Sequence, residues 1–339
     1  MFLFLRKLFM MAMLLATLLP AMSASAQTID PPEGSWGPGN YPANALSGLK
    51  LKYLGISGVT GQQDLNREYI VHIPKLYDAH EPMPLVFCFP GLAQFTQMFC
   101  INGSKKTKAI FSRSGNFIDL SEENGFILVM VQGFQNSWNG GNCCGAAQFQ
   151  KLDDVALIRA ILAEVEQHLI VDRSRVYAAG FSNGAFLANR LACEASDIFA
   201  AIVSGSGGIR LRPMSDCQPA NKVAVLEIHG SKDSLVPYKG AAASVAYWAQ
   251  INGCSAQTSP ASFPPSGGDT QCVSYEGCAA GGQVTSCTIT DGGHCWYGSP
   301  SCGTGFGRIG ASIALLGGKN SDTMVNSDAV WPFLSQFHR

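Results

Sequence analysis

The stretch Gly180-Phe181-Ser182-Asn183-Gly184 follows a short apolar run, Arg175–Ala179, and precedes a stretch of helical period that reaches Cys193. The arrangement called a nucleophile elbow consists of a strand, then a tight turn that carries a serine, then a helix. The flanking glycines let the backbone hold Ser182 in a strained conformation, because bulkier residues there would collide with the adjacent strand and helix. The pattern predicts that Ser182 is a nucleophile and that the N–H of Asn183 binds a developing oxyanion.

A nucleophilic serine needs two further side chains. Its hydroxyl is too weakly acidic to attack an ester unaided, so a base must remove the proton and a third group must orient that base. The expected order along the chain is serine, acid, histidine. His294, after the last predicted strand, is therefore the predicted base, and Asp233, after the seventh strand, is the predicted acid. His229 is expected to hold the Asp233 loop through hydrogen bonds. The weaker candidates for acid or base are Asp197, Asp216, Glu227, Asp291 and His338.

The second oxyanion donor is expected in the loop after the third strand, Phe89-Pro90-Gly91-Leu92-Ala93. Pro90 has no N–H and cannot serve, so Leu92 or Ala93 is the predicted donor and Leu92 is preferred. The alternative is an ordinary turn at a strand end. Three aromatic residues near these motifs are candidates for walls of an acyl pocket, with plain core packing as the alternative: Trp138, Tyr238 and Trp296.

Short apolar, β-branched runs alternate with stretches of helical period, which favours an α/β fold with a mostly parallel eight-stranded sheet flanked by helices. We expect this sheet in a single domain over residues 50–339. The predicted strands are Lys50–Ile56, Arg67–Ile73, Leu85–Phe89, Phe126–Val131, Arg175–Ala179, Ala200–Ser204, Val223–His229 and Val284–Thr290. The predicted helices, besides the one after Ser182, are Asp153–His168, Gly240–Asn252 and Ser327–His338, and Ser255–Gly268 is a predicted loop.

The amino-terminal end of the sequence is typical of an export signal. Arg6 and Lys7 precede an apolar run, Leu8–Leu19, that is too short to span a membrane. Ala24-Ser25-Ala26 has the small residues that signal peptidase cleaves, so the mature chain is expected to begin near Gln27. Residues 1–26 are thus a predicted signal peptide and residues 27–49 a leader. The protein is expected to be secreted, into the medium or the periplasm.

The net charge and the cysteines indicate which partners and which metal sites the chain is not expected to have. Of the 23 basic side chains, removal of Arg6 and Lys7 leaves 21 against 24 acidic ones, a net charge near −3. Such a surface offers no footprint for nucleic acid or anionic lipid, and no second segment of membrane length appears. All twelve cysteines lie beyond the expected cleavage site, which favours disulfides in an exported chain. Cys88, inside an apolar strand, is expected to be a buried free thiol. The spacing of cysteines and histidines does not support a zinc site.

As a set, the motifs resemble the secreted esterase family that joins poly(3-hydroxybutyrate) depolymerases with feruloyl esterases. The resemblance implies an α/β-hydrolase fold, no cofactor, and hydrolysis through an acyl-enzyme by Ser182, Asp233 and His294. It covers residues from about 51 to the end. The motifs that carry it are Trp138-Asn139 with Cys143-Cys144-Gly145, Asp153-Asp154-Val155, the elbow itself with Arg190-Leu191-Ala192-Cys193-Glu194, His229-Gly230 with Asp233 and Val236-Pro237-Tyr238, and Gly293-His294 with Trp296 and Gly298.

The chain departs from this family in three respects, the third being the presence of Cys295 together with Cys302. Where the family has His-Gly-Cys-Gly at the oxyanion strand, this chain has Pro90-Gly91-Leu92-Ala93, and where the family has His-Thr-Trp-Pro-Gly, it has His294-Cys295-Trp296-Tyr297-Gly298. We hypothesise that Cys295 and Cys302 form a small disulfide loop that restrains the histidine segment. Two further pairings are candidates: Cys100 with Cys143 or Cys144, in place of the family's cysteine at position 92, and Cys193 with Cys217.

The sequence therefore predicts a secreted serine carboxylic-ester hydrolase. The ester substrate, polymeric or not, is expected to be a poly(3-hydroxyalkanoate)-type polyester or a feruloyl or acetyl ester of plant polysaccharide. Two alternatives stay open. A serine peptidase on the same fold often carries an additional gating domain. A non-catalytic binding protein on this scaffold would lack one of Ser182, Asp233 and His294, and none is missing here.

Overall fold

A computed structural model of the chain describes residues 50–56, 65–96, 99–100, 117–264, 266–299, 302 and 319–339. The predicted signal peptide and leader, residues 1–49, lie outside these ranges, so their assignment stays a prediction. Among the helices in the described ranges, none combines the length and the apolar character that a bilayer crossing requires.

One ten-stranded sheet organises the described residues, in the order β1-β2-β4-β3-β5-β6-β7-β10-β9-β8. Strands β4, β3, β5, β6, β7 and β10 run parallel, and antiparallel strands extend the sheet at both edges. The bounds are β1 Lys50–Ile56, β2 Leu65–His72, β3 Met83–Phe89, β4 Ile127–Val131, β5 Val171–Phe181, β6 Ala201–Gly205, β7 Ala224–Gly230, β8 Thr258–Pro260, β9 Thr270–Tyr275 and β10 Val284–Ile289. The predicted α/β-hydrolase fold class is confirmed.

The central strands are buried on both faces, which explains why they appear in the sequence as continuous apolar runs. In β3, Leu85, Phe87 and Phe89 join one apolar cluster, while Val86 and Cys88 join the cluster on the opposite face. Side chains that alternate in this way hold a helix layer against each face of the sheet.

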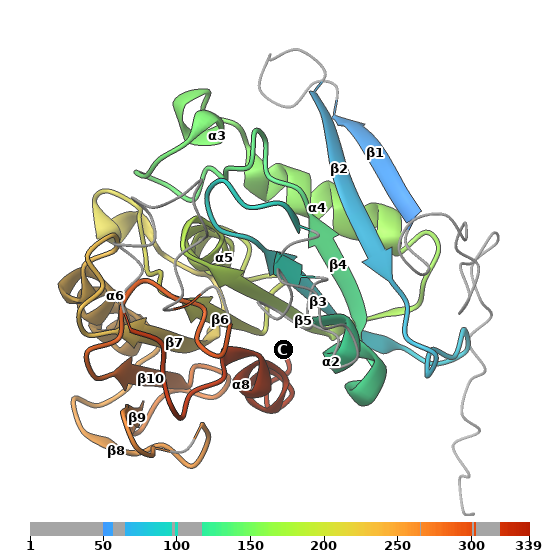
Figure 1. Cartoon of the computed structure of the whole chain (residues 1–339). Helices are drawn as coiled ribbons and strands as arrows, with labels where there is room; N and C mark the ends of the chain where they lie inside the picture. The colour runs from blue at the N-terminus through green and yellow to red at the C-terminus, as the bar shows by residue number, and fades with distance from the viewer. Residues whose placement is uncertain are drawn as a thin grey trace, which may run out of the picture. The chain divides into compact units, whose positions relative to one another are not determined.

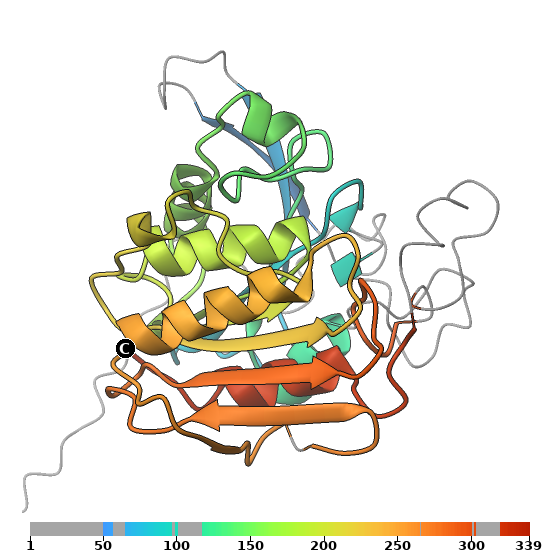
Figure 2. The same ribbon diagram turned by 90° about the vertical axis from the view of Figure 1, so that its left-hand side faces the viewer.

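Helices α4, α5 and α6 pack on one face of the sheet, and α2 and α8 pack on the other (Figure 1). Figure 2 shows α6, in orange, lying along β7 and β10. The predicted helices are present with small shifts at their ends. The bounds are α2 Phe117–Asn124, α3 Ala146–Phe149, α4 Asp154–Val165, α5 Asn183–Glu194, α6 Tyr238–Ile251 and α8 Asn326–Leu334, with a short 3-10 helix, η2, at Met214–Asp216.

The sheet contains two strands that the sequence did not predict. Strand β8 lies inside the segment Ser255–Gly268, which was expected to be a loop, and β9 follows it. Both pair antiparallel beyond β10, where the side chains of β8 and β9 are largely half-buried or exposed. Edge strands of this kind mix polar and apolar residues, so their apolar pattern is weak.

Six disulfides connect the twelve cysteines, and two predicted pairs are confirmed: Cys295–Cys302 and Cys193–Cys217. The prediction of a free Cys88 is wrong, because Cys88 pairs with Cys100. Its side chain lies in the apolar cluster that also contains Phe99 and Cys100. The chain comes back over β3 at these residues, and a local sequence pattern does not reveal such a tertiary contact. The proposed pairing of Cys100 with Cys143 or Cys144 is therefore also wrong. The remaining disulfides are Cys143–Cys144, Cys254–Cys278 and Cys272–Cys287.

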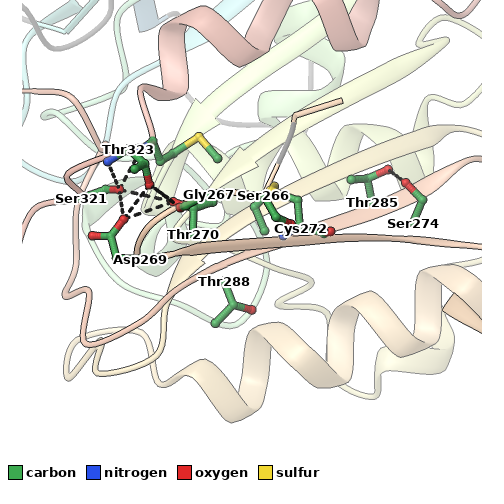
Figure 3. Close-up of a disulfide and its surroundings, with 12 residues drawn as sticks. Ser266, Gly267, Asp269, Thr270, Cys272, Ser274, Thr285, Thr288, Ser321 and Thr323 are labelled. Atoms are coloured by element: carbon green, nitrogen blue, oxygen red, sulfur yellow. Dashed lines mark hydrogen bonds between the residues drawn. A yellow bond between two sulfur atoms is a disulfide. The ribbon is translucent and has the colours of Figure 1, made fainter. Parts of the chain in front are cut away.

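Asp269 ties the turn before β9 to the segment that leads into α8 (Figure 3). Its carboxylate accepts hydrogen bonds from Ser321 Oγ at 2.7 Å, Thr323 Oγ1 at 2.8 Å and the Asp322 N–H at 3.0 Å. Burial alone would raise the pKa of Asp269, but these hydrogen bonds outweigh it and lower the pKa to about 2. The carboxylate is therefore a charged anchor for the carboxyl-terminal segment.

We predict that Asp269→Ala lowers the free energy of unfolding by about 2 kcal/mol at pH 7, because three donors lose their acceptor. The melting temperature should fall by about 4–8 °C in a thermal unfolding experiment. A carboxyl whose folded-state pKa is lowered stabilises the fold fully above its unfolded value of about 4. That contribution is lost as the pH falls through about 2, so the difference from wild type should shrink in acid.

The matched control is Asp322→Ala, because Asp322 is 78% exposed and only its surface ion pair with Lys319 is lost. Its melting temperature should stay close to that of wild type. Equal losses in both variants, or a loss at Asp269 that does not depend on pH, would contradict the anchoring role.

Candidate active site

Ser182 lies in the turn between β5 and α5, with φ 54° and ψ −117°. Its own N–H donates to the Gly205 carbonyl at 2.8 Å, which fixes the turn against the neighbouring strand β6. A Cβ at Gly180 would lie 2.4 Å from the Gly184 oxygen, and a Cβ at Gly184 would lie 2.2 Å from the Phe89 oxygen. The backbone approaches too closely for any side chain at either glycine, as the sequence pattern predicted.

The structure brings together the three side chains that the sequence selected. His294 Nε2 lies 2.8 Å from Ser182 Oγ, and His294 Nδ1 lies 2.7 Å from Asp233 Oδ2. The other carboxylate oxygen of Asp233 accepts the N–H groups of Leu235 at 2.9 Å and Val236 at 2.8 Å. This is hydrogen-bonding distance for proton transfer from the serine to an oriented imidazole. The catalytic roles of these residues stay a prediction.

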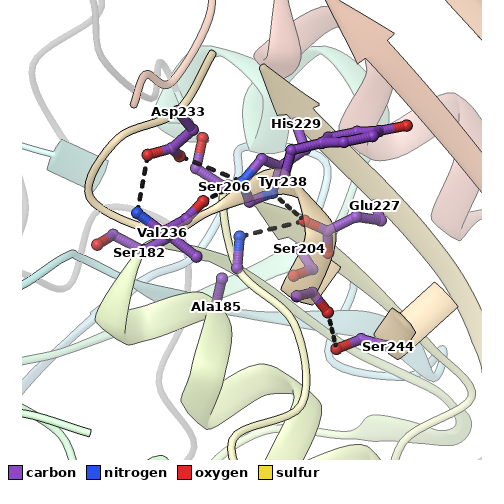
Figure 4. Close-up of polar contacts among 12 residues, drawn as sticks. Ser182, Ala185, Ser204, Ser206, Glu227, His229, Asp233, Val236, Tyr238 and Ser244 are labelled. Carbon is purple, nitrogen blue, oxygen red and sulfur yellow. Dashed lines mark hydrogen bonds and ion pairs between the residues drawn. The ribbon is translucent and has the colours of Figure 1, made fainter. Parts of the chain in front are cut away.

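The side chain of Asp233 is fully buried yet surrounded by donors. Burial alone would raise its pKa, but hydrogen bonds from His229 and His294 and the charge of His294 hold the pKa of Asp233 well below its usual range. Asp233 is therefore ionised at neutral pH. His229 makes the loop contacts expected of it, with Nε2 at 2.8 Å from the Val236 carbonyl oxygen (Figure 4).

The loop after β3 lies beside the serine, since a Cβ at Gly91 would be 3.3 Å from Ser182 Cβ. Two of its amides already have acceptors: the Gly91 N–H donates to Gln94 Oε1 at 2.8 Å and the Ala93 N–H donates to the Asn136 carbonyl at 2.8 Å. Within the described residues, the Leu92 N–H donates to no other group. This leaves Leu92 as the better of the two predicted donors.

The side chain of Asn183 fixes the loop on the other side of the elbow. Its Oδ1 accepts the Trp138 N–H at 2.7 Å, and its Nδ2 donates to the Trp138 carbonyl oxygen at 3.1 Å. The next residue, Asn139, donates its N–H at 2.7 Å to Asp154, which pairs with Arg67 in the interior. The residue after Ser182 thus clamps one loop with its side chain.

Two of the three aromatic candidates are buried in the core. Trp138 is fully buried, with Nε1 donating to the Pro90 carbonyl at 2.9 Å, and Trp296 is 3% exposed, with Nε1 donating to Ser327 Oγ at 3.1 Å. For these two, the geometry favours the core-packing alternative. Tyr238 is half-buried, bonds Thr288 Oγ1 at 2.8 Å and lines a groove of about 270 Å³ against β9 and β10.

Sequence reasoning missed one residue that shapes the site and ranked another only among the weaker candidates. Gln94 fixes the Gly91 amide, and no local pattern announces this contact. Glu227 lies in β7 at 2% exposure and was weighed only as a rival acid. A charged residue inside an otherwise apolar strand was a usable signal, because such a group is rarely buried without a partner.

We predict that Gly184→Ala lowers both stability and any Ser182-dependent activity, because the new Cβ would overlap the Phe89 carbonyl and displace the elbow. The overpacking should cost about 1–3 kcal/mol in the free energy of unfolding. Gly240→Ala is the matched control, since nothing lies within 4 Å of its Cβ position in α6. It should leave the melting temperature unchanged or raise it slightly. Two variants of equal stability would contradict the tight contact at the elbow.

Comparison with known proteins relates the chain to carboxylic-ester hydrolases. Residues 147–266 match the family model described as Phospholipase/Carboxylesterase. A probable feruloyl esterase C of Aspergillus terreus is 31% identical over 240 residues, which cover 69% of this chain and 78% of that protein. Feruloyl esterase B of Piromyces equi is 28% identical over 67% of this chain, but the chain spans only 42% of that protein's length.

A solved structure, the acetyl xylan esterase from Aspergillus awamori, has a similar fold with a TM-score of 0.53 at 14% identity. It covers 73% of this chain and 94% of the esterase. At this identity the likeness concerns the fold alone. The sequence relationship carries the assignment, and the predicted resemblance is confirmed on its feruloyl esterase side. The chain belongs to the α/β-hydrolase esterase family that includes these feruloyl esterases.

Proposed function

We propose that the protein is a secreted serine carboxylic-ester hydrolase that acts through an acyl-enzyme. The single observation that supports it most is the placement of His294, whose two ring nitrogens lie 2.8 Å from Ser182 Oγ and 2.7 Å from Asp233 Oδ2. An imidazole between a hydroxyl and a buried carboxylate can take the serine proton and be stabilised while it carries the charge.

The proposed reaction begins when Ser182 Oγ attacks the ester carbonyl carbon and its proton moves to His294 Nε2. Backbone N–H groups of Asn183 and Leu92 bind the negative oxygen of the tetrahedral intermediate, each contributing about 2.7–4 kcal/mol. The intermediate collapses, the alcohol leaves with the proton from His294, and the acyl group stays on the serine. Water then attacks the acyl-enzyme by the same steps and releases the acid.

Two exposed apolar side chains belong to the loops that carry the proposed reaction. Leu92, on the oxyanion loop, is 44% exposed, and Leu235, two residues after the acid, is 43% exposed. With Trp138 and Trp296 in the core, these leucines are the better candidates for contact with an apolar acyl group. The relatives named as feruloyl esterases favour feruloyl esters as the substrate class, and acetyl esters of plant polysaccharide stay a candidate from the sequence resemblance. A poly(3-hydroxyalkanoate)-type polyester is a further candidate.

Export is part of the same proposal. The amino-terminal signal pattern predicts removal of residues 1–26, and the six disulfides suit an oxidising compartment.

We predict that Ser182→Ala lowers kcat on p-nitrophenyl acetate and methyl ferulate by about 10⁴-fold or more, because no other group can form the acyl-enzyme. The assay should compare these esters with a hydroxybutyrate film and with peptide substrates at equal enzyme concentration. Ser215→Ala, a change at an exposed position on η2, should behave as wild type.

Each outcome has a distinct meaning. Ester hydrolysis that survives Ser182→Ala would exclude this mechanism, and cleavage of peptides without cleavage of esters would favour the peptidase. Absence of hydrolysis on every substrate would favour the non-catalytic binding protein.

A further inference from the structure

The polar contacts at Asp233 continue away from Ser182 into the interior (Figure 4). Asp233 Oδ2 lies 3.2 Å from His229 Nε2, and His229 Nδ1 lies 2.9 Å from Glu227 Oε1. All three side chains are at most 3% exposed. Glu227 Oε1 also accepts the Gly207 N–H at 3.1 Å. The proposed mechanism gives no task to Glu227 or His229, although burying charged groups is costly.

The surroundings of the His229 ring define its protonation. Nδ1 faces the Glu227 carboxylate, and Nε2 faces the Val236 carbonyl oxygen and Asp233 Oδ2. A neutral imidazole would direct one lone pair at these oxygens, whereas a protonated ring donates from both nitrogens. Burial alone would lower the pKa of His229, but hydrogen bonds to Asp233 and Glu227 outweigh it and raise the pKa to about 10.

The charges of the buried group then sum to minus one. Glu227 and Asp233 are negative and His229 is positive, so Glu227 cancels the charge of the imidazolium that contacts Asp233. Without Glu227, the positive ring would neutralise Asp233 and remove the charge that stabilises His294 when it is protonated. Without the ring, the two buried carboxylates would lose the cation that lies between them.

We propose that His229 and Glu227 are positioning residues that work as a charge-balanced pair. His229 holds Asp233 through a donated hydrogen bond, and Glu227 supplies the counter-charge that lets Asp233 keep its full negative charge toward His294. The inference rests on the proposed function, because the benefit appears when His294 accepts the proton of Ser182.

Other charged or titratable groups lie on segments that neighbour Glu227, His229 and Asp233. Arg210, whose guanidinium stacks on the Phe186 ring, and the Tyr297 hydroxyl, which donates to the Gly293 carbonyl, both interact electrostatically with Asp233. Lys232, in the loop after β7, and Asp291, in the loop after β10, form an exposed ion pair. These groups are unchanged in every variant below, so differences among the variants report on the pair.

The first test compares His229→Gln with the double variant Glu227→Gln/His229→Gln. The single change leaves the Glu227 carboxylate without its cation, and we expect kcat to fall about 100-fold, because the unpaired charge repels the Asp233 carboxylate and misplaces it. The added negative charge favours protonated His294, so the acid limb of the kcat/KM profile should move up by about one pH unit. KM should change little.

The double variant restores a net charge of minus one. We expect it to recover at least about tenfold in kcat and to return the acid limb toward wild type, because the unpaired buried charge has gone. If the two residues only fill space, the kcat of the double variant should be at least as low as that of the single variant. The acid limb of the kcat/KM profile should then stay at its wild-type position in both variants. Either of those results overturns the proposal. Circular dichroism and melting temperature confirm that both variants are folded.

Glu122→Gln is the matched control. Glu122 Oε1 lies 3.1 Å from His72 Nε2, a similar carboxylate–imidazole contact between α2 and β2. Removing its charge should leave the acid limb and kcat unchanged. A shift equal to that of His229→Gln would show that any such charge has the same effect, and would overturn the proposal.

A second test does not depend on any substrate. In ¹⁵N-histidine NMR of the wild-type protein at pH 8, the ring signals that disappear in His229→Gln should show both nitrogens protonated. A single protonated nitrogen would overturn the proposal even in an active enzyme. Failure of the proposed function would appear differently, as ester hydrolysis that survives Ser182→Ala, and would leave this measurement unaffected.

Discussion

The first turn of α5 packs so closely on the end of β3 that a Cβ at Gly184 would lie 2.2 Å from the Phe89 carbonyl oxygen. This contact fixes the direction in which the chain leaves β5 and holds Ser182 at φ 54°. The same approach brings the Gly91–Leu92 loop beside the serine, and the side chain of Asn183 then clamps the Trp138 backbone. One steric constraint therefore places Ser182 and both proposed oxyanion donors.

The parallel sheet supplies the other members of the site. Strands β3, β5, β7 and β10 are parallel, so the loops at their carboxyl ends meet at one edge, where ligands of open α/β sheets bind. The loop after β7 brings Asp233 and the loop after β10 brings His294. The Cys295–Cys302 disulfide follows the histidine directly, and Tyr297 donates to the Gly293 carbonyl, so the histidine segment is held on both sides.

Much of this could be predicted because the decisive signals are local. The glycines around Ser182, the position of Asp233 after a strand and the position of His294 after the last long strand are all visible in the sequence. Contacts between distant segments were not visible. Cys88 pairs with Cys100 only because the chain returns over β3, and β9 is a mixed polar strand that gains its partners at the sheet edge. Trp138 and Trp296 stand beside the motifs in sequence, yet both side chains turn into the core.

The central claim is that Ser182 carries the acyl group during turnover. Acid quenching of the enzyme during hydrolysis of p-nitrophenyl acetate, followed by digestion and mass spectrometry, measures this directly. The account predicts one acetyl group on the peptide that contains Ser182, formed quickly and lost when the substrate is exhausted. Steady turnover with that peptide unmodified at every time point, or with the acetyl group on another residue, would contradict it.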